Sequence, residues 1–128
     1  MNYYFSKTLS AGFDSCMERV KEAMRKEGFG VVSEIDMQAK LKEKLGVDFK
    51  RYTIVGACSP TFAHKALQEE DKIGVMLPCN FVVIDQGNGS TEVAAVHPVA
   101  SMMAIQNAAL EPIALEVTRK LQRIISIL

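Results

Sequence analysis

The chain has 128 residues, of which 48% are hydrophobic and 23% charged, as is typical of one globular domain. Fifteen basic and fifteen acidic side chains cancel, and this balance disfavours nucleic-acid binding, which depends on clustered positive charge. The longest uncharged stretch, 93–110, includes His, Pro, Ser, Gln and Asn, so it does not fit a membrane span. We therefore expect neither a nucleic acid nor a membrane as partner.

The three cysteines, Cys16, Cys58 and Cys79, are odd in number and far apart in sequence. A disulfide framework needs an even and denser set, so reduced thiols in the cytoplasm are the better interpretation. No spacing matches a zinc finger or a CxxC redox pair. The first residues have no basic segment followed by an apolar run, so they do not resemble a signal peptide.

The first predicted elements are a strand over residues 2–9 and a long helix that follows Gly12. Aromatic residues alternate along the strand, although Lys7 interrupts its apolar side. Apolar residues of the helix recur at spacings of three and four: Phe13, Met17, Val20 and Met24. Gly28 stands where a left-handed residue ends a helix, because glycine adopts a positive φ without steric cost.

A second strand, 29–35, leads into a brief helix that Asp36 caps and Gly46 ends. The third predicted strand spans 51–58. Ser59-Pro60 then starts a turn, since proline suits an opening helical position, and a short helix over 61–68 follows.

Two further strands, 79–85 and 91–96, flank the sequence Gln-Gly-Asn-Gly, which predicts a tight hairpin. Residues 98–105 are expected to form a short helix or an irregular packing segment. The last helix has an apolar side with steps of three or four residues: Leu110, Ile113, Val117, Leu121, Ile124 and Leu128. Ile125 and Ile127 widen this stripe, as either a deeper core or a partner surface would require.

This order of elements predicts a two-layer α+β domain spanning residues 1–128. We expect a mostly antiparallel sheet of about five strands, with two long helices and two or three short ones packed on it.

Four segments together resemble the domain-of-unknown-function 302 family. They are GFGVVSEIDMQAKLKEKLGVDF from Gly28, YTIVGACSPTFAHKAL from Tyr52, GVMLPCN from Gly74, and the run from Val93 that ends in HPVA. The stretch from Cys-Ser-Pro to Ala-His-Lys-Ala-Leu is the most specific of them. The resemblance implies a compact α+β fold, a dimer and a bacterial or archaeal cytoplasm, and it implies no activity.

The side chains with the most suggestive chemistry are Cys58, His64 and Cys79. Two thiolates and an imidazole suit zinc or copper(I), and an imidazole beside Cys79 could activate it as a redox or nucleophilic thiol. Against both hypotheses, cysteine usually packs as a small buried hydrophobe, and the histidine can simply satisfy its own helix.

A second set, Lys40, Lys42 and Lys44, could bind an anion, although lysines beside an apolar stripe usually form a solvated helix face. No recognisable catalytic set and no cofactor motif is present. We therefore expect a homodimeric, non-enzymatic module that binds a small molecule or a partner, with a metal-binding or thiol-redox protein as the alternative.

Overall fold

The computed structural model describes residues 2–128 and contains a five-stranded antiparallel sheet in the order β1-β5-β4-β3-β2. The strands are β1 (Tyr4–Leu9), β2 (Gly30–Asp36), β3 (Tyr52–Cys58), β4 (Cys79–Gly87) and β5 (Ser90–Val96). The helices are α1 (Phe13–Lys26), α2 (Met37–Leu45), α3 (Pro60–Glu69), α4 (Pro98–Ser101) and α5 (Glu111–Ser126). Short 3-10 turns, η1 (Asp71–Met76) and η2 (Ala108–Leu110), complete the described elements. Within this part of the chain, no helix is long and apolar enough to cross a bilayer.

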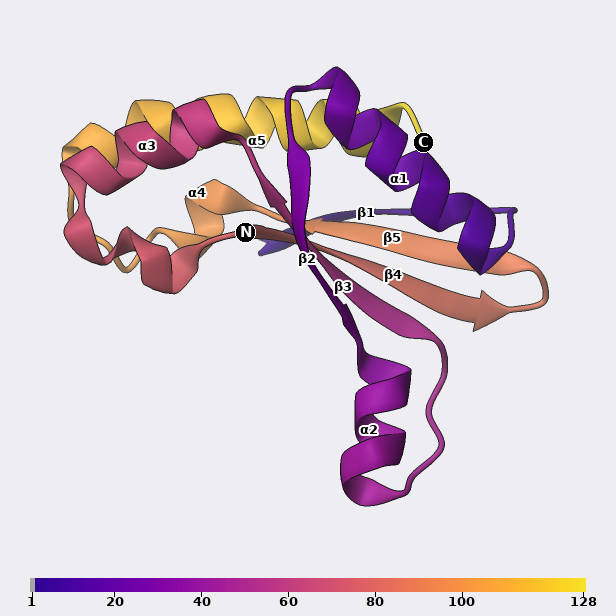
Figure 1. Ribbon diagram of the computed structural model, residues 1–128. Helices are drawn as coiled ribbons and strands as arrows, with labels where there is room; N and C mark the ends of the chain where they lie inside the picture. The colour runs from indigo at the N-terminus through magenta and orange to yellow at the C-terminus, as the bar shows by residue number, and fades with distance from the viewer. Residues whose placement is uncertain (1) are drawn as a thin grey trace.

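Helices α1, α3 and α5 lie together over one face of the sheet (Figure 1). The core fills the space between these two layers. Its fully buried side chains come from the central strands and the two long helices: Val20, Met24, Val55, Phe81, Val83, Val93, Leu121 and Ile124. The predicted two-layer α+β class and the mostly antiparallel sheet are confirmed.

The local signals at helix ends act as the sequence predicts. Gly28 has a φ of +81° and donates its N–H to the Arg25 carbonyl, which ends α1. The Asp36 carboxylate accepts from the Ala39 N–H at 2.9 Å and caps α2, and Gly46, with a φ of +67°, ends it. Each glycine adopts a left-handed conformation that a side chain would strain.

Lys7 lies on the core side of β1. Its charge is accommodated there because its side chain extends to the end of α5. Its Nζ donates to the backbone oxygens of Leu128 at 2.7 Å and Ser126 at 3.1 Å. The last carbonyls of a helix have no intrahelical partner and carry partial negative charge, so a cation stabilises them. The charged residue that interrupts the apolar pattern is therefore a helix cap.

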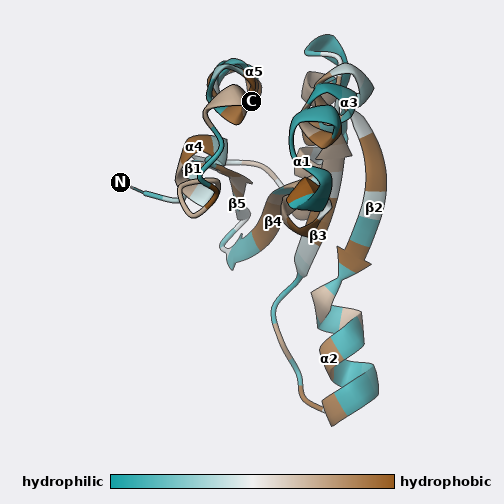
Figure 2. Cartoon of the chain, turned by 90° about the vertical axis from the view of Figure 1, so that its left-hand side faces the viewer, coloured by the Kyte–Doolittle hydropathy of each residue, from teal (hydrophilic) through white to brown (hydrophobic). Residues whose placement is uncertain are grey.

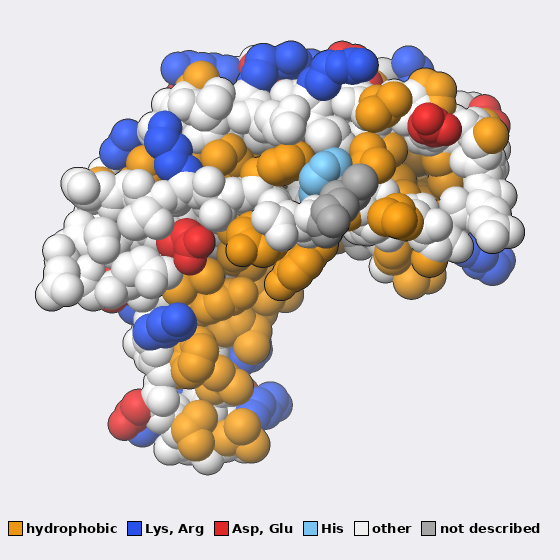
Figure 3. Space-filling model, turned by 180° about the vertical axis from the view of Figure 1, so that it is seen from behind, with side chains coloured by type: hydrophobic (Ala, Val, Ile, Leu, Met, Phe, Trp, Pro, Cys, Tyr) orange, Lys and Arg blue, Asp and Glu red, His pale blue; other side chains and the backbone are white. Residues whose placement is uncertain are grey.

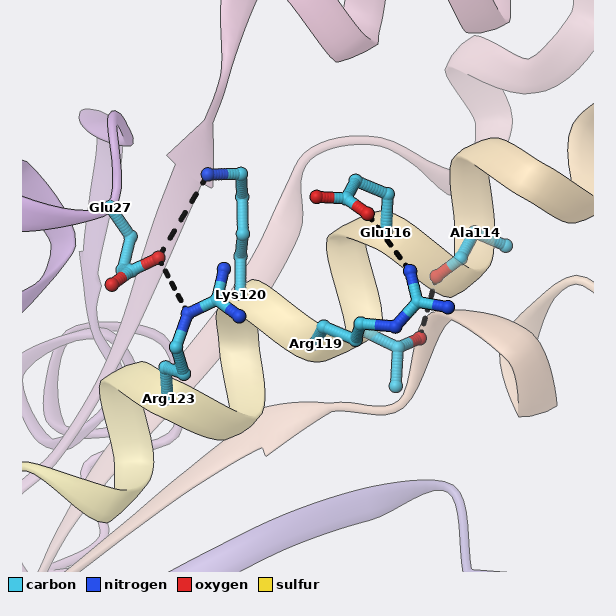
Figure 4. A network of polar contacts seen from close by, with 7 residues as sticks. Glu27, Ala114, Glu116, Arg119, Lys120 and Arg123 are labelled. Atoms are coloured by element: carbon cyan, nitrogen blue, oxygen red, sulfur yellow. Dashed lines mark hydrogen bonds and ion pairs between the residues drawn. The ribbon is translucent and has the colours of Figure 1, made fainter.

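A small ion-pair network joins the end of α1 to α5 (Figure 4). Glu27 accepts from Arg123 Nε at 3.1 Å and lies 3.9 Å from Lys120 Nζ. The Glu27 side chain is only 18% exposed, so these contacts stabilise its charge where water cannot do so fully. The network fixes the two long helices against each other.

Helix α2 departs from the expectation that every helix packs on the sheet. It projects from the ends of β2 and β3, on the side opposite the other helices, and none of its residues is buried (Figures 1 and 2). Leu45 is 69% exposed. The sequence shows that Leu41 and Leu45 share one side of the helix, but this spacing does not show whether that side packs on the sheet.

Candidate functional site

Within residues 2–128, no helix covers the face of the sheet opposite the helix layer, and apolar side chains gather there among polar ones such as Thr8, Asn80 and Glu92. Alternate residues of each strand point to this face, and pairing of β3 with β4 places Tyr52 opposite Ile84 and Ile54 opposite Val82. We call this surface the open face, and its apolar members are Tyr4, Ile35, Tyr52, Ile54, Val82, Ile84, Ala94 and Val96. In Figure 3 hydrophobic side chains gather in the hollowed middle of the molecule and continue downward onto the projecting segment.

The open face holds a hollow of about 380 Å³. All three tyrosines of the chain, Tyr3, Tyr4 and Tyr52, line it. Glu92 also lines it, and its Oε1 accepts a 3.0 Å hydrogen bond from Gln86 Nε2. Among the described strand residues, Glu92 is the charged one that alternation places on this face.

A projecting segment borders the open face at the ends of β2 and β3. We call residues 37–50 the arm; it consists of α2 and the extended residues that return to β3. Gln38 Nε2 donates to the Phe49 carbonyl at 2.9 Å and ties the two halves together. The Phe49 ring lies 6.3 Å from the Tyr52 ring, so the apolar surface continues from the sheet onto the arm.

Cys58 and Cys79 lie at the junction of β3 and β4, where Ala57 is the register partner of Cys79. Both cysteines line a cavity of about 40 Å³, together with Phe62 and Met102. Ser59 supplies the remaining polar side chain of this otherwise apolar lining. The structure therefore brings two of the three candidate thiol and imidazole residues to one place.

Burial raises the pKa of the Cys79 thiol to about 11, and the neighbouring Cys58 adds a smaller electrostatic contribution in the same direction. Since the thiolate is the reactive form of cysteine, Cys79 is held in its unreactive form at neutral pH.

His64 lies on the exposed side of α3 and does not line the cysteine cavity. Across residues 2–128, no group of three or more His, Cys, Asp or Glu residues is arranged to hold a metal ion. The third cysteine, Cys16, is buried in α1 within the main core. Although His64 is only six positions after Cys58, it lies on the side of α3 that faces away from the cavity of the two thiols.

Lys40, Lys42 and Lys44 are all exposed on α2. Lys42 Nζ lies 3.0 Å from the Asp48 carboxylate, and the other two each lie 3.9 Å from Glu43. Each candidate anion ligand therefore already has a carboxylate beside it, and the three lysines form part of the arm.

Sequence reasoning did not identify the open face. Its signal was present in the runs Phe81-Val82-Val83-Ile84 and Val93-Ala94-Ala95-Val96, which are apolar at every position. A strand with one solvated face alternates apolar and polar residues, whereas a continuous apolar run is typical of a strand covered on both faces.

Comparisons with known proteins give a consistent result. The model of the family described as Domain of unknown function DUF302 matches residues 5–128. A solved structure, described as the crystal structure of uncharacterized conserved protein DUF302 from Bacillus stearothermophilus, is similar with a TM-score of 0.90. That similarity has 31% sequence identity and covers 98% of each chain. A comparison with curated proteins gave no match.

Proposed function

The chain belongs to the family of Domain of unknown function DUF302. We propose that it is a homodimeric, non-enzymatic interaction module. The observation that carries the proposal is the open face, where four neighbouring strands present apolar side chains with no helix over them. The family description supplies no activity, so the argument depends on this surface. A second copy of the chain is the occupant that we propose.

The size of the open face supports burial by a partner. Five strands about 4.8 Å apart, each contributing about 20 Å of length, give a face of about 480 Å². The largest apolar patch on an ordinary monomer is about 300–600 Å² and often has a function, so a face of this size is a candidate interaction surface. Val82 and Ile84 are already half-buried, so covering each of them completely would contribute less than the roughly 1.5–3 kcal/mol of a fully exposed side chain, and the sum over the face favours association.

The proposed homodimer also fits the chemistry of the chain as a whole. A twofold interface uses the same surface on both copies, so one apolar face is sufficient to build it. A net charge of zero imposes no strong repulsion between copies. Three free cysteines suit a reducing compartment, and we propose the cytoplasm as the location.

The experiment is a mass measurement by light scattering on the purified protein at micromolar concentration. We expect twice the 14.1 kDa chain mass for the wild type and the single-chain mass for Val82→Asp, which puts a carboxylate in the middle of the open face. Leu67→Asp is the control, since it puts the same carboxylate on an exposed apolar position of α3 in the helix layer, away from the open face.

Unfolding gives a second readout if Val82→Asp does not fold. The midpoint of wild-type thermal unfolding should rise with protein concentration, because association stabilises only the folded chain. A mass near 14.1 kDa together with a midpoint that is independent of concentration contradicts the homodimer. A 14.1 kDa species that carries a bound small molecule through purification would make the open face a ligand site instead.

A metal-binding or thiol-redox protein is the alternative, and the shared cavity of Cys58 and Cys79 is the observation in its favour. Elemental analysis of untagged protein tests the metal, with stoichiometric zinc or copper as the supporting result. A thiol titration across pH tests the redox function. Its supporting result is a Cys79 that reacts near neutral pH, whereas the burial of this thiol predicts slow reaction.

A further inference from the structure

We infer that the arm of each copy lies across the open face of the other copy, so that the interface contains two equal arm-to-face contacts. This inference rests on the proposed homodimer and specifies which surfaces meet within it. Residues 37–50 of one copy would cover the hollow that Tyr4, Tyr52 and Val82 line on the partner. Each chain would both insert an arm and receive one.

The direction of the arm is the first argument. It projects from the sheet on the side opposite the helix layer, which is the side of the open face (Figures 1 and 2). The arm and the open face therefore border a hollow, which Figure 3 shows lined with hydrophobic side chains. Two such shapes can interlock around a twofold axis, because each offers a projection and a recess.

The exposure of the arm is the second argument. Leu45, Val47 and Phe49 are 69%, 44% and 43% exposed, and no residue of α2 is buried. A nine-residue helix is about 13.5 Å long, and isolated helices shorter than roughly 12–15 residues are marginal in water. Helix α2 therefore leaves apolar surface exposed that further tertiary contacts could bury.

The internal ties of the arm are the third argument. Asp36 caps α2, Gln38 holds the Phe49 carbonyl, and Lys42 pairs with Asp48. These contacts hold the arm in one shape before association. A preformed arm loses less conformational entropy on binding than a flexible one, so more of its apolar burial appears as affinity.

Charge is the fourth argument. The arm carries four lysines and two carboxylates, which gives it a net charge of +2. The open face carries Glu92 as its charged residue among the described strand positions. A basic, apolar arm therefore complements an acidic, apolar face, and this pairing favours arm-to-face contact over face-to-face contact, which would bring two Glu92 side chains together.

A mixing experiment with two variants tests the inference. The arm variant carries Leu45→Asp and Val47→Asp, and the face variant carries Val82→Asp. Each variant alone breaks both contacts of its homodimer, whereas a mixed dimer keeps one complete contact, between the intact arm of the face variant and the intact face of the arm variant. Light scattering and sedimentation then give the mass and dissociation constant of each sample.

We expect a dissociation constant about 1000-fold weaker than wild type for each variant alone and about 30-fold weaker for the equimolar mixture. If the arm variant dimerises like the wild type while the face variant is monomeric, the arm inference is overturned and the homodimer stands. If the mixture associates no better than its components, the inference is also overturned. A monomeric wild type contradicts the homodimer itself.

Circular dichroism establishes that each variant folds before the mixing is interpreted. Ile54→Thr serves as a second face variant, because threonine is well tolerated in strands and still removes apolar surface from the open face. Ser substitutions at positions 45 and 47 serve as the second arm variant. Arm changes leave the core intact, since every arm residue lies outside it.

Discussion

Replacing Gly56 by alanine should destabilise the protein although the new side chain is only a methyl group. Gly56 lies in β3, between its register partners Ser33 in β2 and Asn80 in β4. A Cβ at this position would collide with the Ser33 hydroxyl oxygen and would lie 2.7 Å from Pro78 Cγ. Because β3 is hydrogen-bonded on both sides, its backbone cannot move away from these neighbours without disturbing the sheet.

The magnitude follows from two opposing effects. Overpacking of this kind costs about 1–3 kcal/mol, and the lower flexibility of alanine in the unfolded chain returns about 0.4–1 kcal/mol. We expect a net loss of about 1–2 kcal/mol for Gly56→Ala. Gly30→Ala is the matched control in the neighbouring strand, because a Cβ there has nothing within 4 Å and neither glycine has a positive φ.

The assay is urea unfolding followed by circular dichroism at one fixed protein concentration, since association would change the apparent stability. Adding Ser33→Ala to Gly56→Ala should recover part of the loss, because it removes the hydroxyl oxygen that the new methyl group meets. If Gly56→Ala is as stable as Gly30→Ala, the result contradicts the claim that Ser33 and Pro78 leave no room for a methyl group at position 56.

Two further predictions concern ionisable groups. Because the folded chain holds the Cys79 pKa at about 11 against an ordinary 9.0, its neutral form favours folding, and that stability is lost as pH rises from 9 to 11. The wild type should lose about 2 kcal/mol more than Cys79→Ala across this interval in urea unfolding, and parallel curves would contradict this. Lys7→Met should cost about 1–2 kcal/mol, because the carbonyls of Ser126 and Leu128 lose a charged donor. Lys72→Met, at an exposed lysine that pairs with Asp71 beside it, should be nearly neutral in the same assay.

The fold could be predicted from the sequence because local and long-range signals agree. The apolar period of α1 and α5, the left-handed glycines after helices and the hairpin between β4 and β5 each specify one element. The positive φ values of Asn88 and Gly89 are those that a two-residue hairpin turn requires, and Gly87 has a positive φ at the adjoining register shift of β4. These features depend on short stretches of chain, which a single sequence displays directly.

The candidate site could be predicted only in part. The sequence placed Cys58 and Cys79 at the ends of successive strands, and antiparallel pairing brings such ends together. It could not show that His64 points away, because the rotation of α3 about its axis depends on the packing of Phe62 and Ala66 against the core. A rotation of a helix by one residue decides whether a side chain faces a cavity or the solvent.

The projection of α2 could not be predicted for a different reason. Leu41 and Leu45 give the same helical pattern whether the helix covers its own sheet or that of another copy. The pattern identifies the apolar side of the helix and does not identify the surface against which that side packs. The continuous apolar runs of β4 and β5 carry the same ambiguity for the open face.

Hydrogen exchange of the α2 amides in the wild-type protein tests the central claim most directly. If a second copy covers the arm, the amides of residues 37–45 are protected at high protein concentration and lose this protection on dilution below the dissociation constant. The core amides of β4 should stay protected at both concentrations. Fast exchange of α2 at every concentration would contradict the claim that a second copy covers the arm.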